Sequence, residues 1–127
     1  MAEQSEKTLQ SKEKGHLLYQ NGCIIDVTYY DAEKPGDPFG YMSEGVIQLF
    51  SDGRIVVYNL IDRRVLEDFN VINLFVANNN INNYDPRYRT HVAFSINTKG
   101  IHIIFQSIEI KKEFWDVFTL VFRNLRR

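Results

Sequence analysis

Apolar and polar residues alternate along several stretches of the chain. Within Cys23–Tyr30, the odd-numbered positions are apolar or aromatic, and Asp26 and Thr28 lie between them. Thr90–Asn97 shows the same alternation. Because successive side chains of a strand point to opposite faces, this pattern predicts half-buried β-strands. With other β-branched and aromatic runs, the predicted strands are Leu17–Tyr19, Cys23–Tyr30, Gly45–Phe50, Arg54–Leu60, Val71–Ala77, Thr90–Asn97 and Ile101–Gln106.

Residues that favour turns separate these runs. A turn at Asn21-Gly22 is expected to end the first strand, and Ser51-Asp52-Gly53 predicts a tight hairpin. Thr98-Lys99-Gly100 predicts a second hairpin. The segments Asp31–Gly40 and Asn78–Arg89 are rich in proline, glycine or asparagine, which favour turns over strand pairing, so both are predicted loops.

After Phe105 the spacing of apolar residues changes to that of a helix. Ser107 suits the N-cap position, and Glu109 suits the first turn. A helix is therefore predicted from about Ser107 to Arg126, with Trp115 mostly buried. Its predicted apolar stripe comprises Ile108, Trp115, Phe118, Phe122 and Leu125, widened by Phe114, Val117 and Val121.

Strands followed by one helix predict a mainly β fold with an antiparallel sheet. A sheet of about seven strands must close or split to bury one face, and the helix is expected to plug its open end. The chain has 127 residues, which suits a single domain, expected at 15–127. Residues 1–14 are mostly polar, so they are predicted to form a flexible N-terminal segment or a lead-in that is not part of the domain.

Overall charge and cysteine content restrict the classes of function. Lysine and arginine number 15 and aspartate and glutamate 16, so no basic excess favours nucleic-acid binding. One cysteine cannot form an intramolecular disulfide. No apolar run approaches the roughly 20 residues of a membrane span. The expected location is the cytoplasm.

Catalytic and metal-binding motifs are not evident. The glycines form no GxGxxG motif or P-loop. Cys23 lies in register with Ile25, which favours a buried structural residue over a nucleophile. His91 and His102 are expected on one outer face, where two imidazoles can hold a metal, but no third ligand is evident. We therefore predict a protein without catalysis, metal or cofactor.

The C-terminal third resembles the pleckstrin homology (PH) domain family. Its strand Gly100–Phe105 leads into a helix with the chain's single tryptophan, Trp115, and PH domains typically place a tryptophan there. The opening Lys14–Leu18 also resembles the family's usual start. The resemblance implies a seven-stranded antiparallel barrel capped by the helix. A polo-box-like domain is the nearest alternative, but it pairs with a second box.

The positions of the basic residues indicate which ligand such a domain would bind. Many PH domains bind phosphoinositides between the first two strands, but here Lys34 is the only base among four acids. The chain up to Arg63 has a formal net charge of −4, whereas the remainder has a net charge of +3. Basic residues predicted in loops are Arg54, Arg63, Arg64, Arg87, Arg89 and Lys99. We expect Arg63-Arg64 and Arg87-Tyr88-Arg89 to converge at one rim, although ordinary solvated charge is an equal alternative.

Heavy use of asparagine, isoleucine and lysine, with an inserted asparagine tract, resembles apicomplexan parasite sequences. In that setting a short PH domain resembles the acylated PH-domain family, which implies phosphatidic-acid sensing on a secretory organelle. Residue 2 is Ala2, so the family's Gly-Cys acylation terminus is missing and a truncated start is expected.

These observations predict a membrane-recruitment module, peripheral at a membrane surface, that binds an anionic phospholipid. A phosphomonoester needs only a few donors. The alternative is a PH-like domain that binds a peptide or partner protein. The predicted lipid-binding residues are Lys34, Arg63, Arg64, Arg87 and Arg89.

Overall fold

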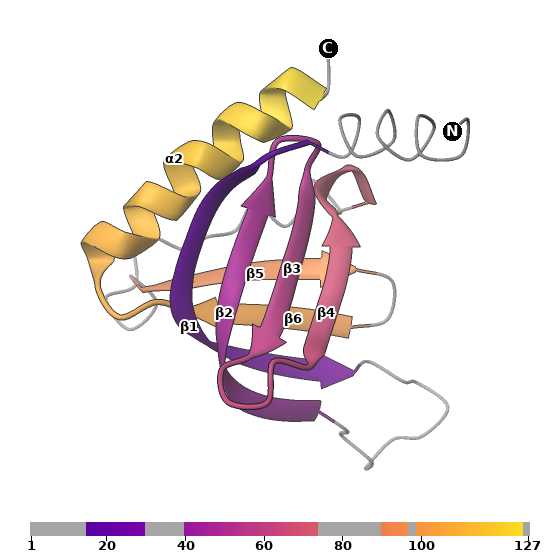
Figure 1. Cartoon of the computed structure of the whole chain (residues 1–127), viewed down its shortest axis with the longest axis vertical. Coiled ribbons are helices and arrows are strands. Elements are labelled where there is room, and N and C mark those ends of the chain that lie inside the picture. The colour runs from indigo at the N-terminus through magenta and orange to yellow at the C-terminus, as the bar shows by residue number, and fades with distance from the viewer. Residues whose placement is uncertain (1–14, 30–39, 74–89, 97–98, 126–127) are drawn as a thin grey trace, which may run out of the picture.

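The computed structural model describes residues 15–29, 40–73, 90–96 and 99–125. Within them, six strands precede one long helix (Figure 1). The strands are β1 (Leu17–Tyr29), β2 (Gly40–Phe50), β3 (Arg54–Asn59), β4 (Val65–Asn70), β5 (His91–Ile96) and β6 (Lys99–Ile104). A short 3-10 helix, η1 (Val71–Asn73), follows β4, and α2 (Ile108–Leu125) ends the described chain.

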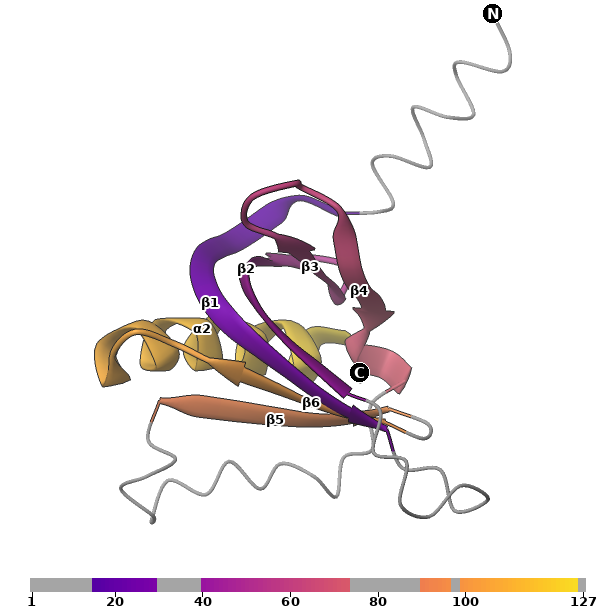
Figure 2. The same cartoon turned by 90° about the horizontal axis from the view of Figure 1, so that it is seen from below.

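The strands form a single antiparallel sheet in the order β4-β3-β2-β1-β6-β5. β1 pairs with β2 along its length, but with β6 only from Ile24 onward. The sheet bends around the middle of β1, so that β5 and β6 cross behind β2, β3 and β4 (Figure 1). Figure 2 shows the resulting half-barrel from below. The mainly β, antiparallel fold predicted from the sequence is therefore confirmed.

Inward side chains of the sheet and one face of α2 form the core. Ile25, Ile47, Ile55 and Ile101 are fully buried, as alternation along each strand requires. Among the described residues, the largest fully buried side chain is Phe114 of α2. Its ring lies against four aromatic neighbours: Tyr19, Phe94, Phe105 and Phe118. These contacts attach the helix to both halves of the curled sheet.

Ser107 begins the helix as predicted, since its Oγ accepts a hydrogen bond from the backbone N–H of Ile110 (3.1 Å). The buried stripe is rotated from the predicted one, because Phe114 takes the fully buried position and Trp115 is only partly buried. Trp115 stacks on Phe118, with ring centroids 4.9 Å apart. Ile108, predicted in the stripe, is 47% exposed.

Three strand predictions were wrong. Asn21-Gly22 does not turn, because Asn21 pairs with Ile47 and Gly22 with Val46, and β1 continues through both. The strand predicted at Val71–Ala77 is wrong over Val71–Asn73, which forms the 3-10 helix η1, and its remainder lies outside the described residues. The strand β4 at Val65–Asn70 was not predicted. The described chain therefore has six strands, where about seven were predicted.

The β2–β3 hairpin at Ser51-Asp52-Gly53 is confirmed, with the Gly53 N–H donating to the Phe50 carbonyl (2.9 Å). The second hairpin turns earlier than predicted. Ile96 pairs directly with Lys99, so Lys99 and Gly100 belong to β6.

Among the described residues, side chains bridge the gap between β4 and the strands β5 and β6 at the other end of the sheet. The buried Glu67 of β4 accepts hydrogen bonds from the Lys99 ammonium (2.5 Å) and the Tyr41 hydroxyl (2.6 Å). Burial and the bond to Glu67 raise the pKa of Tyr41. Beside this cluster the rings of Phe69 and Phe94 lie 5.7 Å apart. We call this line of contact the β4–β5/β6 seam.

Candidate functional site

The turn between β3 and β4 exposes three large apolar side chains. Leu60, Ile61 and Val65 are 46%, 85% and 56% exposed, and Ile61 is the most exposed large hydrophobic residue of the described chain. Exposed apolar side chains grouped in this way mark interaction surfaces, because each costs free energy in water. We call Leu60–Val65 the β3–β4 turn.

Hydrogen bonds within the β3–β4 turn fix its shape. The Asn59 Oδ1 accepts from the backbone N–H groups of Ile61 (2.8 Å) and Asp62 (3.0 Å). The Asp62 Oδ1 accepts from the N–H of Arg64 (2.9 Å), and the Asn59 N–H donates to the Arg64 carbonyl (2.8 Å). The turn is therefore preorganised, and little further ordering is needed when it binds a partner.

Arg63 holds an unusual backbone conformation. Its φ is +63°, and no other described residue except glycine has a positive φ. An arginine there costs conformational energy that glycine or asparagine would avoid. Its guanidinium lies 5.9 Å from the centroid of the Tyr58 ring, which directs the side chain along β3. Arg63 and Arg64 are both exposed.

The structure separates the predicted basic residues into two groups. Arg63 and Arg64 lie together, and no described carboxylate forms an ion pair with either of them. Arg54 and Lys99, also predicted as loop bases, form ion pairs with Asp68 (2.7 Å) and with Glu67. The remaining predicted lipid-binding residues, Lys34, Arg87 and Arg89, lie outside the described residues. The convergence of Arg87 and Arg89 with Arg63 and Arg64 stays a prediction.

The apolar members of this turn were missed in the sequence. Leu60 was predicted as the end of a strand, and Arg63 and Arg64 were predicted as basic residues of a loop. The signal was the apolar pair Leu60-Ile61 directly before those charges, with Val65 directly after them. Apolar residues that flank adjacent bases are typical of segments that bind anionic membrane surfaces.

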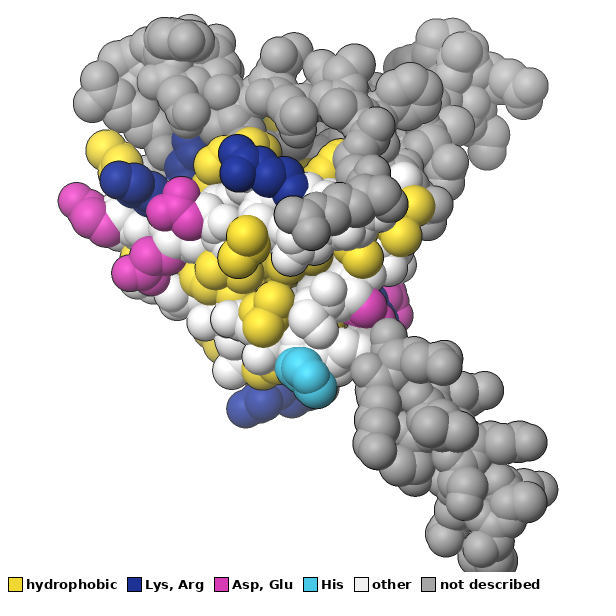
Figure 3. Space-filling model, turned by 90° about the horizontal axis from the view of Figure 1, so that it is seen from above, with side chains coloured by type: hydrophobic (Ala, Val, Ile, Leu, Met, Phe, Trp, Pro, Cys, Tyr) yellow, Lys and Arg dark blue, Asp and Glu magenta, His cyan; other side chains and the backbone are white. Residues whose placement is uncertain are grey.

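The opposite end of the sheet has a different surface. Figure 3 views the molecule from the side of the β2–β3 hairpin and the end of α2. Basic and acidic side chains lie next to each other there, with apolar atoms between them.

Cys23, His91 and His102, which were considered for catalysis or metal binding, lie outside the β3–β4 turn. Cys23 is 7% exposed, and burial raises the pKa of its thiol to about 12, which agrees with the structural interpretation. His91 and His102 do share an outer face, with ring centroids 6.4 Å apart. Burial, followed by the charge of His102, lowers the pKa of His91. Within the described ranges, no three candidate ligands group around a metal position.

No protein-family model and no curated protein sequence matches this chain. Among the helices that the structure describes, none combines the length and the apolar character needed to cross a bilayer. The β3–β4 turn therefore stands on its own geometry as the candidate site.

Proposed function

We propose that this chain is a PH-like membrane-recruitment module that binds anionic phospholipid through the β3–β4 turn. The observation that carries the proposal is the exposure of Ile61, Arg63 and Arg64 on one short turn that its own hydrogen bonds hold in shape. The order of six strands and a capping helix supports the PH-like assignment. The proposed location is the cytoplasmic face of a membrane, peripheral to it.

Apolar and electrostatic contributions act together in this proposal. Burying a side chain such as Ile61 in the bilayer interface contributes about 1.5–3 kcal/mol. Each arginine near an anionic surface adds about 1 kcal/mol. Either contribution alone gives weak, reversible binding, so the two signals together are needed for recruitment.

Phosphatidic acid is the proposed ligand. Its phosphomonoester carries roughly two negative charges, and one or two guanidinium groups match it through paired N–H···O bonds. A polyphosphoinositide needs more donors, and the segment after β1 offers only Lys34 among acids. The small headgroup therefore suits the two arginines better.

Co-sedimentation with vesicles tests the proposal. We expect pelleting with phosphatidylcholine vesicles that contain phosphatidic acid, and less pelleting as salt rises from about 0.1 M to about 1 M. Ile61→Ser should weaken binding roughly tenfold or more. The double change Arg63→Ala with Arg64→Ala should weaken it roughly thirtyfold. Arg54→Ala is the matched control, since Arg54 is held by Asp68, and it should bind within about twofold of wild type.

The competing function is a protein-interaction domain that uses the same turn. Failure to pellet with phosphatidic acid or any phosphoinositide at low salt would sink the lipid proposal and favour a peptide or protein partner. Equal loss from Arg54→Ala and from the Arg63/Arg64 change would also count against the β3–β4 turn, because general charge would then explain the binding.

A further inference from the structure

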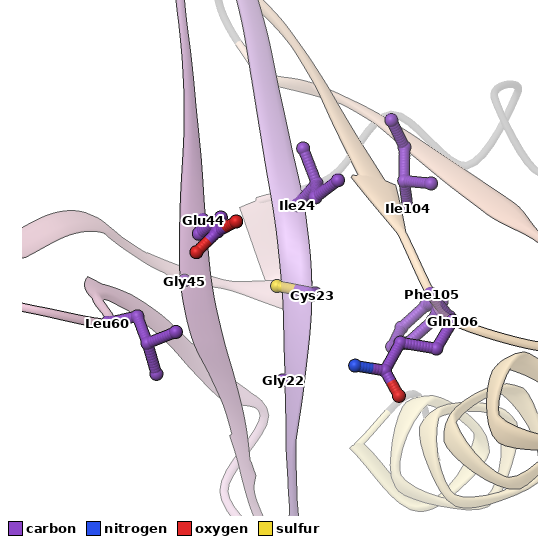
Figure 4. A pocket seen from close by; sticks show the side chains of 9 residues that line it. All are labelled: Gly22, Cys23, Ile24, Glu44, Gly45, Leu60, Ile104, Phe105 and Gln106. Carbon is purple, nitrogen blue, oxygen red and sulfur yellow. The ribbon is translucent and has the colours of Figure 1, made fainter.

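A half-open hollow of about 240 Å³ adjoins the β3–β4 turn. It lies where β1 and β6 part, since their pairing begins only at Ile24 and Ile104. Figure 4 shows Leu60 approaching from the side of β2, with Ile104 and Gln106 on the side of β6. The lining includes Gly22, Ile24, Glu44, Leu60, Ile104 and Gln106.

Neither the backbone conformation nor the packing of the fold requires glycine at position 22, where the missing side chain leaves space in the hollow. The φ of Gly22 is not among the positive values that glycine alone accepts readily, which belong to Gly15 and Gly53. A Cβ added to Gly22 would meet no atom within 4 Å. Glycine within a strand weakens it, and often marks a place where a ligand approaches closely. The missing side chain therefore points to an occupant of the hollow.

The walls of the hollow favour an apolar occupant. Ile24 and Leu60 are 38% and 46% exposed, so apolar surface is available for contact. The exposed carboxylate of Glu44 stands among the lining residues and would repel a phosphate. Charge thus excludes a headgroup from this hollow and leaves the aliphatic surface for a hydrocarbon chain.

The hollow and the β3–β4 turn are one continuous structure. Leu60 belongs to both, and its N–H donates to the carbonyl of Glu44 (3.2 Å), which fastens the turn to the lining. A headgroup held by Arg63 and Arg64 would therefore place its chains beside the hollow. At about 240 Å³ the hollow has room for several methylene groups, each of which is about as large as a water molecule.

We propose that this hollow binds the first methylene groups of an acyl chain of the lipid whose phosphate Arg63 and Arg64 hold. The inference rests on the proposed function and deepens it, because it makes the chain as well as the headgroup part of the recognised ligand. Each methylene that leaves water tightens binding by up to roughly fourfold.

Soluble ligands that differ only in chain length test this inference. The probes are glycerol 3-phosphate, dibutyryl phosphatidic acid and dihexanoyl phosphatidic acid, titrated as monomers and followed by NMR amide shifts. Affinity should rise with chain length, by about two- to fourfold per buried methylene. The amides of Gly22, Leu60 and Ile104 should shift with the two acylated probes and not with glycerol 3-phosphate.

Filling the hollow should remove the effect of chain length only. Gly22→Val should bind all three probes with the affinity of glycerol 3-phosphate. Thr28→Val is the matched control, because Thr28 is an exposed position of β1 outside the lining, and it should behave as wild type. Ile104→Thr, which trims one wall and keeps a β-branched side chain, should reduce the chain-length effect. It provides a second variant if Gly22→Val lowers stability through the bend of β1.

Wild-type affinity that does not change with chain length would overturn the inference, as would an undiminished chain-length effect in Gly22→Val and Ile104→Thr. If phosphatidic-acid vesicles still bound through Arg63 and Arg64 in that case, the proposed function would stand, and the hollow would be left to a protein side chain. Loss of vesicle binding altogether would instead remove the proposed function.

Discussion

The turns at the two ends of β3 share two local features but differ in what surrounds them. Each contains a residue with positive φ: Gly53 at +92° in the β2–β3 hairpin, and Arg63 at +63° in the β3–β4 turn. Each also brings an arginine to about the same distance from an aromatic ring, 5.9 Å for Arg54 over Phe50 and for Arg63 over Tyr58.

What differs is the neighbourhood of each backbone. A Cβ on Gly53 would collide with Leu125 and Val71, so packing against α2 and η1 dictates glycine there. The β3–β4 turn has Ile61 at its surface, and its arginines have no described acidic partner. The same backbone conformation is thus a packing requirement at one end of β3, and at the other it displays a charged side chain.

The largest effect should come from Gly53→Ala. The added methyl group is strained at positive φ and overlaps Leu125, so unfolding free energy should fall by about 2–4 kcal/mol. Arg63→Gly is the matched change in the other turn and should stay within about 0.5 kcal/mol of wild type. Urea unfolding measures both. Equal losses in the two variants would show that both turns are set by packing.

A smaller effect is expected for Asn59→Ala. The side chain accepts bonds from Ile61 and Asp62 and donates to the Ser43 Oγ (3.1 Å), so its loss should cost about 1 kcal/mol. Vesicle binding should weaken as well, because the turn loses its fixed shape. Asn59→Asp keeps the acceptor and should retain most of the stability. Unchanged vesicle binding in Asn59→Ala would contradict the idea that preorganisation matters.

The smallest effect is the change of stability with pH that the Arg54–Asp68 ion pair causes. Arg54 lowers the pKa of Asp68 below its ordinary value of 3.8, so the ion pair stabilises the fold above about pH 4. This contribution is lost as pH falls through the lowered pKa and Asp68 becomes protonated. The pair is about 40% exposed, so we expect only a few tenths of a kcal/mol.

Urea midpoints between pH 3 and pH 6 would measure this effect. Arg54→Ala should remove the acid-dependent part, whereas Arg64→Ala should leave the pH profile unchanged. A pH profile altered equally by both variants would show that Arg64 has a structural partner, and would weaken the contrast between the two turns.

Local rules predicted those elements whose residues are fixed by their immediate neighbours. The cap at Ser107, the hairpin at Gly53 and the alternation of Val92, Phe94 and Ile96 each depend on short-range geometry. Together they were sufficient to predict a mainly β fold with a C-terminal helix. The β3–β4 turn was predicted only through Arg63 and Arg64.

The features that were not predicted from the sequence depend on tertiary contacts between distant residues. Asn21-Gly22 favours a turn in isolation, but pairing with β2 keeps both residues extended. β4 was missed because it carries Glu67, which is buried only through Tyr41 and Lys99 from distant strands. The exposure of Ile61 is likewise a property of the assembled sheet, since an apolar residue after a strand normally predicts burial.

The β4–β5/β6 seam has a consequence for how the molecule opens. No main-chain ladder joins β4 to β5 among the described strands, so separating them breaks side-chain contacts alone. β1 pairs with a neighbour on both sides from Ile24 to Thr28, and we expect it to be the last strand to release its amides to solvent exchange. We therefore expect brief openings of the native state to begin along the seam, with β1 as the hinge that keeps the two halves joined.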